Sequence, residues 1–385
     1  MKRKHILSVS ILAAALLLSM TAFAGPKVAI VKSDNHKLVG ESYKLDINII
    51  QPYDFSKPIS ETQYVHPEWT KESEEAIEKM VRKSIELAGD WPVKKGNTVF
   101  IKPNYVVDAW NRLTANKAKP EEIQSCVTDP RVIRGVALVA LESGAGKVLI
   151  GELPAHGDSY ATAKIYGCEL VVKELAKEYP GKVELLDLKS VPFAYYKAEK
   201  TGGLALKEYA IPKILMEADV VISVPKMKTH MMAGITVSLK NIGIGAPTST
   251  VYGQPKFGLP HQRLAEVIVD VCKIVGIDYT VVDAIWAMEG NGPMDGSPIA
   301  MDMVVAGKDP VAVDWVCTEC MGFKGEMFGI TRLAQKYGLG TYQNVEVVGV
   351  PIAQVMKHFE PVPRALRLPT VYSHNVGWGP DAVAK

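Results

Sequence analysis

The sequence predicts an α/β protein with a mostly parallel, doubly wound sheet flanked by helices, built as one large domain or as two intimately joined ones. Short apolar runs rich in Val and Ile, which are typical of buried parallel strands, alternate along the chain with stretches whose apolar residues recur at helical spacing. With 385 residues, of which 48% are hydrophobic and 22% charged, the chain is long enough to bury a substantial core.

In the first half of the chain, helix caps and stops define the elements best. Thr70 is a cap, the apolar residues after it are spaced three and four apart, and Gly89 stands where a helix ends. Residues 144–147, Gly-Ala-Gly-Lys, follow a predicted helix, whereas a phosphate-binding loop follows a strand and opens a helix, so we expect a helix end here. The predicted elements, in order, are strand 27–31, an irregular or covering arm over 33–69, helix 70–88, strand 99–101, a helix from Asp129 to Leu141, strand 148–150, helix 160–177 and strand 183–186.

The second half is organised around the run from Val220 to Val224, the best candidate for a buried parallel strand. Pro225 ends this strand, because proline has no N–H to give to a neighbouring strand. A second apolar-alternating run, 235–239, then leads to Lys240 and Asn241. The other predicted elements are a hairpin within 191–209, a helical piece over 211–217, a glycine-rich turn over 243–245, helix 264–275, strand 279–282, strand 303–306, a helix that begins at Asp309-Pro310 and strand 345–350.

The N-terminus has the pattern of a cleaved secretory signal. A positive segment, Lys2 to Lys4, precedes an apolar run over 6–20, and Ala22-Phe23-Ala24 fits the small-x-small cleavage rule. The apolar run is shorter than the ~20 residues of a membrane-spanning helix. We therefore expect an exported protein, periplasmic or extracellular, with no stable membrane span after cleavage. Its expected parts are a signal peptide over 1–24, an α/β domain over 25–358 and an irregular C-terminal tail over 359–385.

The charge balance argues against a nucleic-acid partner. The chain has 44 Lys and Arg against 42 Asp and Glu. Three of the basic residues lie at positions 2–4, so the mature chain has 41 against 42 and a net charge of −1. A nucleic-acid-binding domain would need a basic patch or a high pI.

Five cysteines lie in the expected mature chain, so at least one is unpaired if all disulfides are internal. Cys317 and Cys320 are three residues apart in the helix that begins at Asp309, and they share one face of it. We interpret them as buried core thiols. The alternative is a redox or metal pair that serves a redox partner protein.

Four of the predicted strands end in polar clusters. The carboxyl ends of parallel strands lie at the same edge of a sheet, where open α/β proteins bind ligands, so we expect these clusters to converge on one cleft. Polar groups at the end of a buried strand are costly unless they are paired or line such a cleft. The candidate residues are Lys102 and Asn104 after the first strand, Glu152 and His156 after the second, Lys226, Lys228, Thr229, His230, Lys240 and Asn241 after the third, and Asp283, Glu289 and Asn291 after the fourth.

The residue types predict what such a cleft could do. Its lysines would hold a small anion, a carboxylate or a phosphate, or would lower one another's pKa until one of them is a nucleophilic amine. Its histidines could act as acid or base near neutral pH, and its carboxylates could orient these groups, hold a cation or pair with the lysines. We assign catalytic roles to His230, Lys240, Glu152 and His156, and substrate binding to the other candidates. No His-x-x-x-His or comparable ligand cluster predicts a transition-metal site.

Several blocks of the sequence resemble one family. They are Lys-Pro-Asn at 102–104, PKMKTHMMAGITVSLKNIGIGAP at 225–247, and VVDAIWAMEGNGPMDGSP at 281–298 followed by GKDPVAVD. These blocks are similar to the domain-of-unknown-function family 362, and the resemblance covers nearly the whole mature chain. That family is often joined to ferredoxin-type cluster domains, and this chain lacks the cysteine spacing of those domains.

A second resemblance is to the nickel-pincer lactate racemase family, in which a histidine acts on the substrate and a lysine tethers the cofactor. Pro-x-x-x-x-His-x-x-x-Gly, with a lysine ten residues after the histidine, is similar to that family, and His230, Gly234 and Lys240 match the spacing. No histidine follows Lys240 at the distance of the racemase's nickel ligand; Lys256 and His261 lie nearby instead. The resemblance therefore implies the fold and a His230/Lys240 pair, and it leaves the cofactor unknown.

Two functional hypotheses follow. The first is an exported enzyme with isomerase- or lyase-like acid–base chemistry on a small anionic metabolite, in which His230 is acid or base and Lys240 is nucleophile or electrostatic stabiliser. The second is a non-catalytic periplasmic binding protein or a redox accessory protein.

Overall fold

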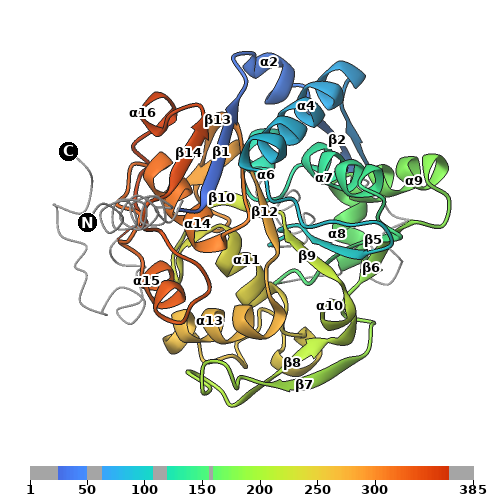
Figure 1. The fold of residues 1–385 in the computed structure, drawn as a ribbon. Helices are drawn as coiled ribbons and strands as arrows, with labels where there is room; N and C mark the ends of the chain where they lie inside the picture. The colour runs from blue at the N-terminus through green and yellow to red at the C-terminus, as the bar shows by residue number, and fades with distance from the viewer. Residues whose placement is uncertain (1–24, 50–62, 107–118, 156–158, 364–385) are drawn as a thin grey trace, which may run out of the picture.

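The computed structural model describes residues 25–49, 63–106, 119–155 and 159–363, and within these ranges one large sheet dominates the fold (Figure 1). The main path of this sheet runs β14-β1-β13-β12-β9-β4-β5-β6. Neighbouring strands are parallel except at β13, which is antiparallel to both of its neighbours. The predicted α/β fold with a mostly parallel sheet is confirmed. The strands are β14 (Glu346–Gly349), β1 (Lys27–Lys32), β13 (Ser297–Gly307), β12 (Tyr279–Glu289), β9 (Val220–Ser223), β4 (Thr98–Lys102), β5 (Lys147–Glu152) and β6 (Val183–Asp187).

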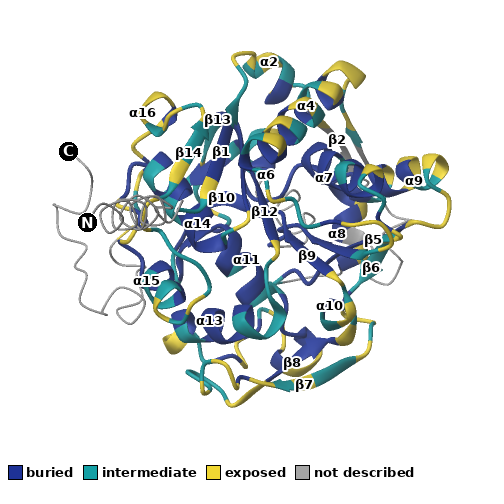
Figure 2. Cartoon of the chain, in the orientation of Figure 1, coloured by how far each residue is buried: buried dark blue, intermediate teal, exposed yellow. Residues whose placement is uncertain are grey.

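Helices cover both faces of the sheet, and β4 shows why they must. Val99 and Ile101 pack in the core under one layer of helices, whereas Phe100 packs under the other, because successive side chains of a strand alternate between the faces. Figure 2 shows the central strands of the sheet buried, with many of the exposed residues on the outer sides of helices and in loops. The first layer contains α4 (Lys71–Ala88), α7 (Pro130–Glu142) and α9 (Cys168–Glu178), and the second contains α11 (Ser238–Gly245), α13 (Leu264–Val275), α14 (Pro310–Cys320) and α15 (Gly329–Lys336).

The helices with strong local signals begin and end where the sequence predicts. Thr70 caps α4 by accepting a hydrogen bond from the backbone N–H of Ser73, and Gly89 ends that helix with a φ of 70°. Asp129 and Asp309 cap α7 and α14 through their carboxylates, and each is followed by a proline in the first turn.

Shorter elements complete the described chain. The hairpin expected within 191–209 forms as the antiparallel pair β7 (Phe193–Lys197) and β8 (Glu208–Pro212), apart from the main sheet, and its second strand continues three residues past the expected end. The shorter elements, in chain order, are α2 (His36–Val39), β2 (Lys44–Ile49), β3 (Gln63–Glu68), α6 (Pro120–Gln124), α8 (Ser159–Ile165), β7 (Phe193–Lys197), β8 (Glu208–Pro212), α10 (Lys213–Glu217), β10 (Lys226–His230), β11 (Gly234–Thr236), α12 (Ser249–Tyr252), the 3₁₀ helix η1 (His261–Arg263) and α16 (Ile352–Val355).

Two expectations for the first half were wrong. The stretch 33–69 is not simply irregular: it contains α2 and the antiparallel pair β2-β3, whose pairing of distant segments leaves no local periodic signal. The helix expected over 160–177 is two helices, α8 and α9. Gly167 separates them with a φ of 83°, a left-handed conformation that a continuous helix cannot contain.

The expectations around Pro225 need a further correction. The polar residues after this proline do not simply follow the end of a strand but form a strand of their own, β10, which pairs with β12 beyond the point where β9 ends. The strand expected over 279–282 therefore continues to Glu289 and pairs first with β9 and then with β10. Lys240, Asn241 and the glycines at 243–245 lie in helix α11, not in a strand end and turn.

A distant carboxylate explains why α11 begins where it does. Asp314 on α14 accepts hydrogen bonds from the backbone N–H groups of Ser238 (2.7 Å) and Leu239 (3.3 Å), the first two residues of α11. These N–H groups have no partner inside a helix, so the carboxylate serves as its N-cap. The alternating pattern over 235–239 gave no sign of this contact.

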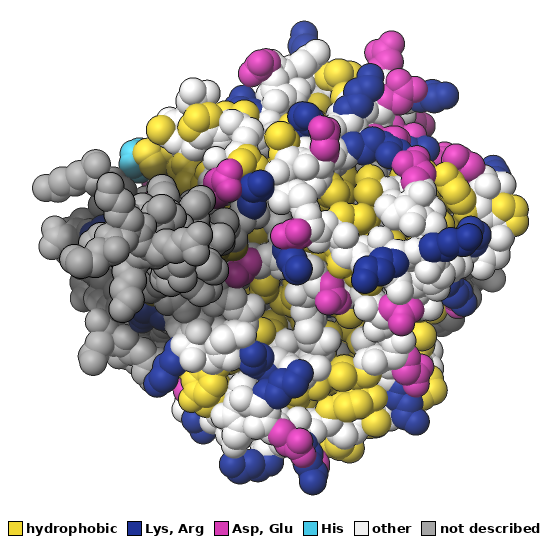
Figure 3. Space-filling view, in the orientation of Figure 1, with side chains coloured by type: hydrophobic (Ala, Val, Ile, Leu, Met, Phe, Trp, Pro, Cys, Tyr) yellow, Lys and Arg dark blue, Asp and Glu magenta, His cyan; other side chains and the backbone are white. Residues whose placement is uncertain are grey.

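The surface and the chain ends add three observations. On the face shown in Figure 3, Lys and Arg side chains are interspersed with Asp and Glu. No helix within the described ranges is long and apolar enough to cross a membrane. The expected signal peptide over 1–24, His156 and most of the expected tail lie outside the described residues, and the part of the tail over 359–363 forms no helix or strand.

Candidate functional site

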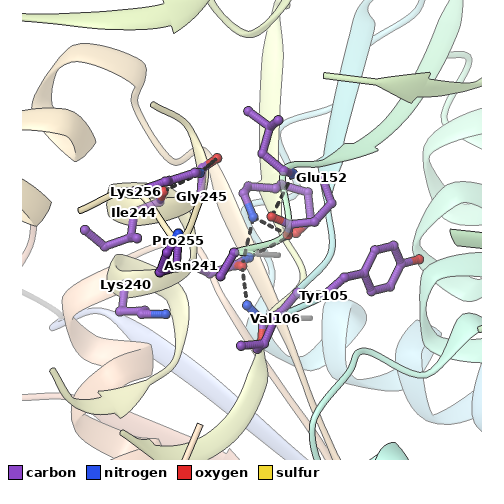
Figure 4. Close-up of a pocket in the computed structure, with 13 residues that line it drawn as sticks. Tyr105, Val106, Glu152, Lys240, Asn241, Ile244, Gly245, Pro255 and Lys256 are labelled. Carbon is purple, nitrogen blue, oxygen red and sulfur yellow. Dashed lines mark hydrogen bonds and ion pairs between the residues drawn. The ribbon is translucent and has the colours of Figure 1, made fainter. Parts of the chain in front are cut away.

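The candidate site forms at the carboxyl ends of β4 and β5, where two charged side chains meet. Lys102 ends β4 and Glu152 ends β5, and because these strands are parallel neighbours both side chains emerge at the same edge of the sheet. The Lys102 ammonium forms an ion pair with the Glu152 carboxylate, and both side chains are buried (Figure 4). A buried pair of this kind needs further hydrogen bonds to offset its desolvation.

Asn241 on α11 supplies those hydrogen bonds. Its Oδ1 accepts from the Lys102 ammonium (3.1 Å) and from Asn104 Nδ2 (3.2 Å), and its Nδ2 donates to the Lys102 carbonyl (3.0 Å) and to Ser223 Oγ (3.1 Å). This arrangement fixes the orientation of both amides. Asn104 Oδ1 is then left buried without a partner within the described chain, so a donor that enters the site would satisfy it.

Two more lysines complete the cluster. Lys256 is 2% exposed and donates to the carbonyls of Ile244 (2.7 Å) and Gly245 (3.0 Å) at the end of α11. Lys240 has no hydrogen-bond or ion-pair partner among the described residues, and Figure 4 shows it beside the cavity without one.

These side chains surround a small cavity of ≈ 40 Å³, hereafter the lysine cavity. Lys102, Lys240 and Lys256 all line it, and Glu152 is the only carboxylate among its described lining residues. Gly245 leaves the space that Lys102 occupies, because a Cβ at this position would lie 2.1 Å from Lys102 Cε. The described lining of the cavity therefore has three lysine amines and one carboxylate.

Burial and mutual repulsion perturb the lysines. Desolvation, with repulsion from Lys102, lowers the pKa of Lys240 from 10.5 to about 8 against the attraction of Glu152. Desolvation also lowers the pKa of Lys256, to about 7, and that of Lys102, although Glu152 raises both. Without another negative charge in the cavity, the amines of Lys240 and Lys256 are therefore partly neutral near pH 7.

A second pocket of ≈ 170 Å³, hereafter the apolar pocket, adjoins the lysine cavity. The two share Lys240 and four other lining residues: Val106, Ala155, Ile244 and Pro255. His230 and His261 both line the apolar pocket.

The two histidines have opposite tautomers. His230 Nδ1 accepts from the backbone N–H groups of Met232 (3.1 Å) and Ala233 (3.2 Å), so its ring proton is on Nε2. Desolvation and the nearby Lys240 and Lys228 hold the pKa of His230 well below its ordinary value, and its ring stays neutral. His261 Nδ1 lies 2.9 Å from the Leu259 carbonyl and must donate to it, which leaves a lone pair on Nε2. Burial lowers the pKa of His261 as well.

Comparison with known proteins identifies the family. The family model described as a domain of unknown function (DUF362) matches residues 99–319, more than half of the chain. The chain belongs to this family. All the lysine and histidine side chains described above lie inside the matched segment.

The DUF362 chain is also similar to a named relative, a thylakoid-associated protein of Synechocystis sp. The two are 30% identical over 232 residues, which are 60% of this chain and 64% of the relative, so the match spans less than two thirds of that protein.

Two solved structures match part of the chain at low scores. The lactate racemase apoprotein from Thermoanaerobacterium thermosaccharolyticum has 14% identity and a TM-score of 0.35, covering 64% of this chain and 55% of the racemase. A protein from Thermotoga maritima has 13% identity and a TM-score of 0.32, covering 68% of this chain and 59% of its own.

The structure brings together only some of the candidate residues of this DUF362 chain. Lys102, Asn104, Glu152, Lys240 and Asn241 line the lysine cavity, and His230 lines the adjoining apolar pocket. His156 lies outside the described residues.

The other candidates interact elsewhere, mostly along β10 and β12. Lys226 forms a buried ion pair with Asp283 (2.8 Å), and Asp283 also accepts from the backbone N–H of Asp129 (2.7 Å). Lys228 donates to the Cys126 carbonyl (2.6 Å), and Thr229 Oγ1 to the Gly290 carbonyl (3.0 Å). These contacts hold β10 against its neighbours, a structural role that their polar sequence pattern does not distinguish from ligand binding.

Two further candidates, Glu289 and Asn291, lie at the end of β12 and just beyond it. Glu289, the last residue of β12, accepts from the backbone N–H of Glu360 (2.9 Å). Asn291 has a buried Oδ1 without a partner in the described chain. Neither residue lines the lysine cavity or the apolar pocket.

Sequence reasoning assigned no role to Lys256 or His261. Both lie between α12 and α13 in a segment rich in Gly and Pro, where a lysine or a histidine is ordinary. Their only signal was nearness in sequence to Lys240. Within the described ranges, no three His, Cys, Asp or Glu side chains are grouped so that they could hold a metal ion.

Proposed function

We propose that this DUF362 protein is an enzyme that binds a small anion in the lysine cavity and catalyses proton transfer next to the anionic group. The observation that carries the proposal is the charge of the cavity, in which three buried or half-buried lysines face a single carboxylate among the described lining residues. Burying like charges together is costly, and an anion that enters would favour the protonated form of each amine.

The size of the cavity supports a small anionic group. A water molecule needs about 10–15 Å³ of such space, so ≈ 40 Å³ fits a group of about three non-hydrogen atoms, such as a carboxylate. Lys240 has no partner in the described chain to give up, which makes it the first contact for the anion. A hydroxyl or an ordered water beside the anion would satisfy Asn104 Oδ1.

The two histidines support acid–base chemistry beside the anion. His261 Nε2 has the lone pair and could take a proton from the carbon next to the carboxylate. The electron pair of the broken C–H bond would then move into the carboxylate group and give an enediolate. The lysines would stabilise the added negative charge. His230 lines the same pocket as a neutral imidazole whose ring proton is on Nε2. Return of the proton, or of one exchanged with solvent, completes the cycle.

Deuterium exchange tests this proposal without knowledge of the natural substrate. The protein is incubated in D₂O with carboxylates of two to six carbons, including 2-hydroxy acids, and proton NMR follows the C–H signal next to the carboxylate. We expect loss of that signal for some of them with the parent protein and with Lys79→Met, which removes an exposed lysine on α4. We expect no exchange with Lys240→Met or His261→Gln.

Native mass spectrometry of the same samples separates binding from chemistry. His261→Gln should keep the bound anion that Lys240→Met loses. An anion that binds to the parent protein but is never exchanged would instead identify a non-catalytic binding protein. A parent protein that binds neither a carboxylate nor inorganic phosphate would refute the anion site itself.

We also propose that residues 1–24 direct export to the periplasm or beyond. The positive segment, the apolar run and the Ala-Phe-Ala site support this proposal. Mass spectrometry of the protein from fractionated cells tests it: an exported form that begins at Gly25 is expected, and a cytosolic form that retains Met1 would refute it.

A further inference from the structure

We infer that the ligand of this site is amphiphilic, with its anionic group in the lysine cavity and an apolar body of several carbons in the apolar pocket. This inference rests on the proposed anion site and specifies the substrate class that it selects. The observation that carries it is the continuity of the two spaces, which share five lining residues with Lys240 at the junction.

The two spaces have different chemistry. The lysine cavity has six charged or amide side chains in its described lining, those of Lys102, Lys240, Lys256, Glu152, Asn104 and Asn241, beside several apolar residues. The apolar pocket is lined mainly by hydrophobic side chains, among them Met231, Met232, Phe257, Leu264 and Met294. A ligand held at Lys240 by its anionic group therefore has its next atoms beside an apolar surface. A polar extension would lose its hydration there without gaining partners.

The sizes of the two spaces agree with this division. The lysine cavity, at ≈ 40 Å³, leaves no room for more than the anionic group, and the apolar pocket, at ≈ 170 Å³, is about four times larger. Burial of each methylene in such a pocket increases affinity about three- to fourfold. Methionines adapt to apolar ligands of different shape, so a linear or a branched chain of a few carbons fits this lining.

Phe257 marks the outer end of the apolar pocket. Its side chain is 69% exposed, the most exposed of the large hydrophobic residues in the described chain, and its ring packs edge-to-face on His261 with centroids 5.1 Å apart. Because Phe257 lines the apolar pocket, its ring is placed to contact the apolar body of a ligand there. It also places the apolar body of the ligand against the histidine that we propose as the base.

A chain-length series on the full-length mature protein tests the inference. Calorimetry or ligand-induced shifts in melting temperature would give the affinity for acetate, butanoate and hexanoate, with inorganic phosphate as a ligand that lacks a carbon chain. We expect affinity to rise at least tenfold from acetate to hexanoate. Phe257→Ala should weaken hexanoate binding three- to tenfold and leave acetate binding unchanged. As a control, Tyr195→Ala removes an exposed aromatic side chain elsewhere, on β7, and should change neither the hexanoate affinity nor the acetate affinity.

The outcomes distinguish this inference from the proposed function. Equal affinity for all three carboxylates, lost in Lys240→Met, would overturn the amphiphilic ligand and leave the anion site standing. Chain-length dependence that survives in Lys240→Met would also overturn it, because the anion would then not anchor the chain. Absence of binding for every probe would refute both.

Discussion

Asn241 binds Lys102 at both ends: its Oδ1 accepts from the ammonium at 3.1 Å, and its Nδ2 donates to the carbonyl of the same residue at 3.0 Å. One amide on α11 thus fixes both the main chain and the side chain of Lys102, the last residue of β4. Every hydrogen-bonding position of this amide is used once Asn104 and Ser223 are included. The lysine cavity is therefore preorganised by contacts between elements that are far apart in sequence.

Replacement of Asn241 by leucine should be strongly destabilising. It leaves the Lys102 ammonium and the Asn104 and Ser223 side chains short of partners in a buried site, at a cost of about 2–4 kcal/mol in the free energy of unfolding. Urea denaturation would measure this loss. Gln343→Leu, which replaces an exposed amide, should change the free energy by less than about 0.5 kcal/mol. Equal effects of the two substitutions would contradict the structural role of Asn241.

Anion binding and the stability of the unliganded protein should respond to pH in opposite directions. The pKa of Lys240 is about 8 and that of Lys256 about 7 in the folded chain, against an ordinary value of 10.5. Between these values and 10.5 the unfolded chain binds more protons, so the contribution of these lysines to the free energy of unfolding rises with pH. Anion affinity should fall over the same range, because the charged amines are lost.

The pH dependence has a direct control. In the double variant Lys240→Met/Lys256→Met, the rise in stability between pH 7 and pH 10 should be smaller than in the parent protein, measured by urea denaturation at each pH. Calorimetric titration with butanoate should show the parent affinity falling above pH 8. A parent affinity that is constant to pH 10 would mean that neither lysine contacts the anion.

Asp314 should be a positioning residue for the lysine cavity. Its carboxylate caps α11, the helix that carries Lys240 and Asn241. Asp314→Ala should cost about 1–2 kcal/mol of stability and weaken anion binding several-fold. Asp309→Ala, which removes a comparable cap from α14, should cost a similar amount of stability but leave anion affinity intact. If both variants bind the anion equally well, the cap does not position the site.

Cys317 and Cys320 should behave as core thiols. All five cysteines are buried and none of them forms a disulfide in the described chain. Desolvation raises the pKa of Cys320 to about 12 and that of Cys317 well above its ordinary value, so neither is a thiolate near pH 7. We expect neither residue to react with iodoacetamide in the native protein, as mapped by peptide mass spectrometry.

A substitution separates the core role from a redox role. Cys317→Ser should lower the free energy of unfolding by about 1–3 kcal/mol, because a hydroxyl replaces a thiol in an apolar core, and should keep anion binding and deuterium exchange. A folded Cys317→Ser variant that has lost its activity would favour the redox hypothesis.

Local signals in the sequence were sufficient for the helices that have strong caps. Thr70 and Gly89 mark the two ends of α4, and Asp129 and Asp309 cap the first turns of α7 and α14. These ends were predictable because capping depends on residues within one turn of each other. The meeting of Lys102 and Glu152 was also predictable, since residues that end neighbouring parallel strands share an edge of the sheet.

Only the tertiary structure decided how the polar residues are divided between the scaffold and the cavity. Lys102 and Lys226 both lie beside a proline at the end of a predicted buried strand, yet Lys226 pairs with Asp283 on β12 while Lys102 lines the cavity. The difference comes from which strand lies alongside each lysine, and strand pairing joins residues far apart in the chain. The helix that carries Lys240 likewise depends on the distant cap Asp314. Side-chain chemistry could therefore be listed from the sequence, but its convergence required the packing of segments that carry no local record of one another.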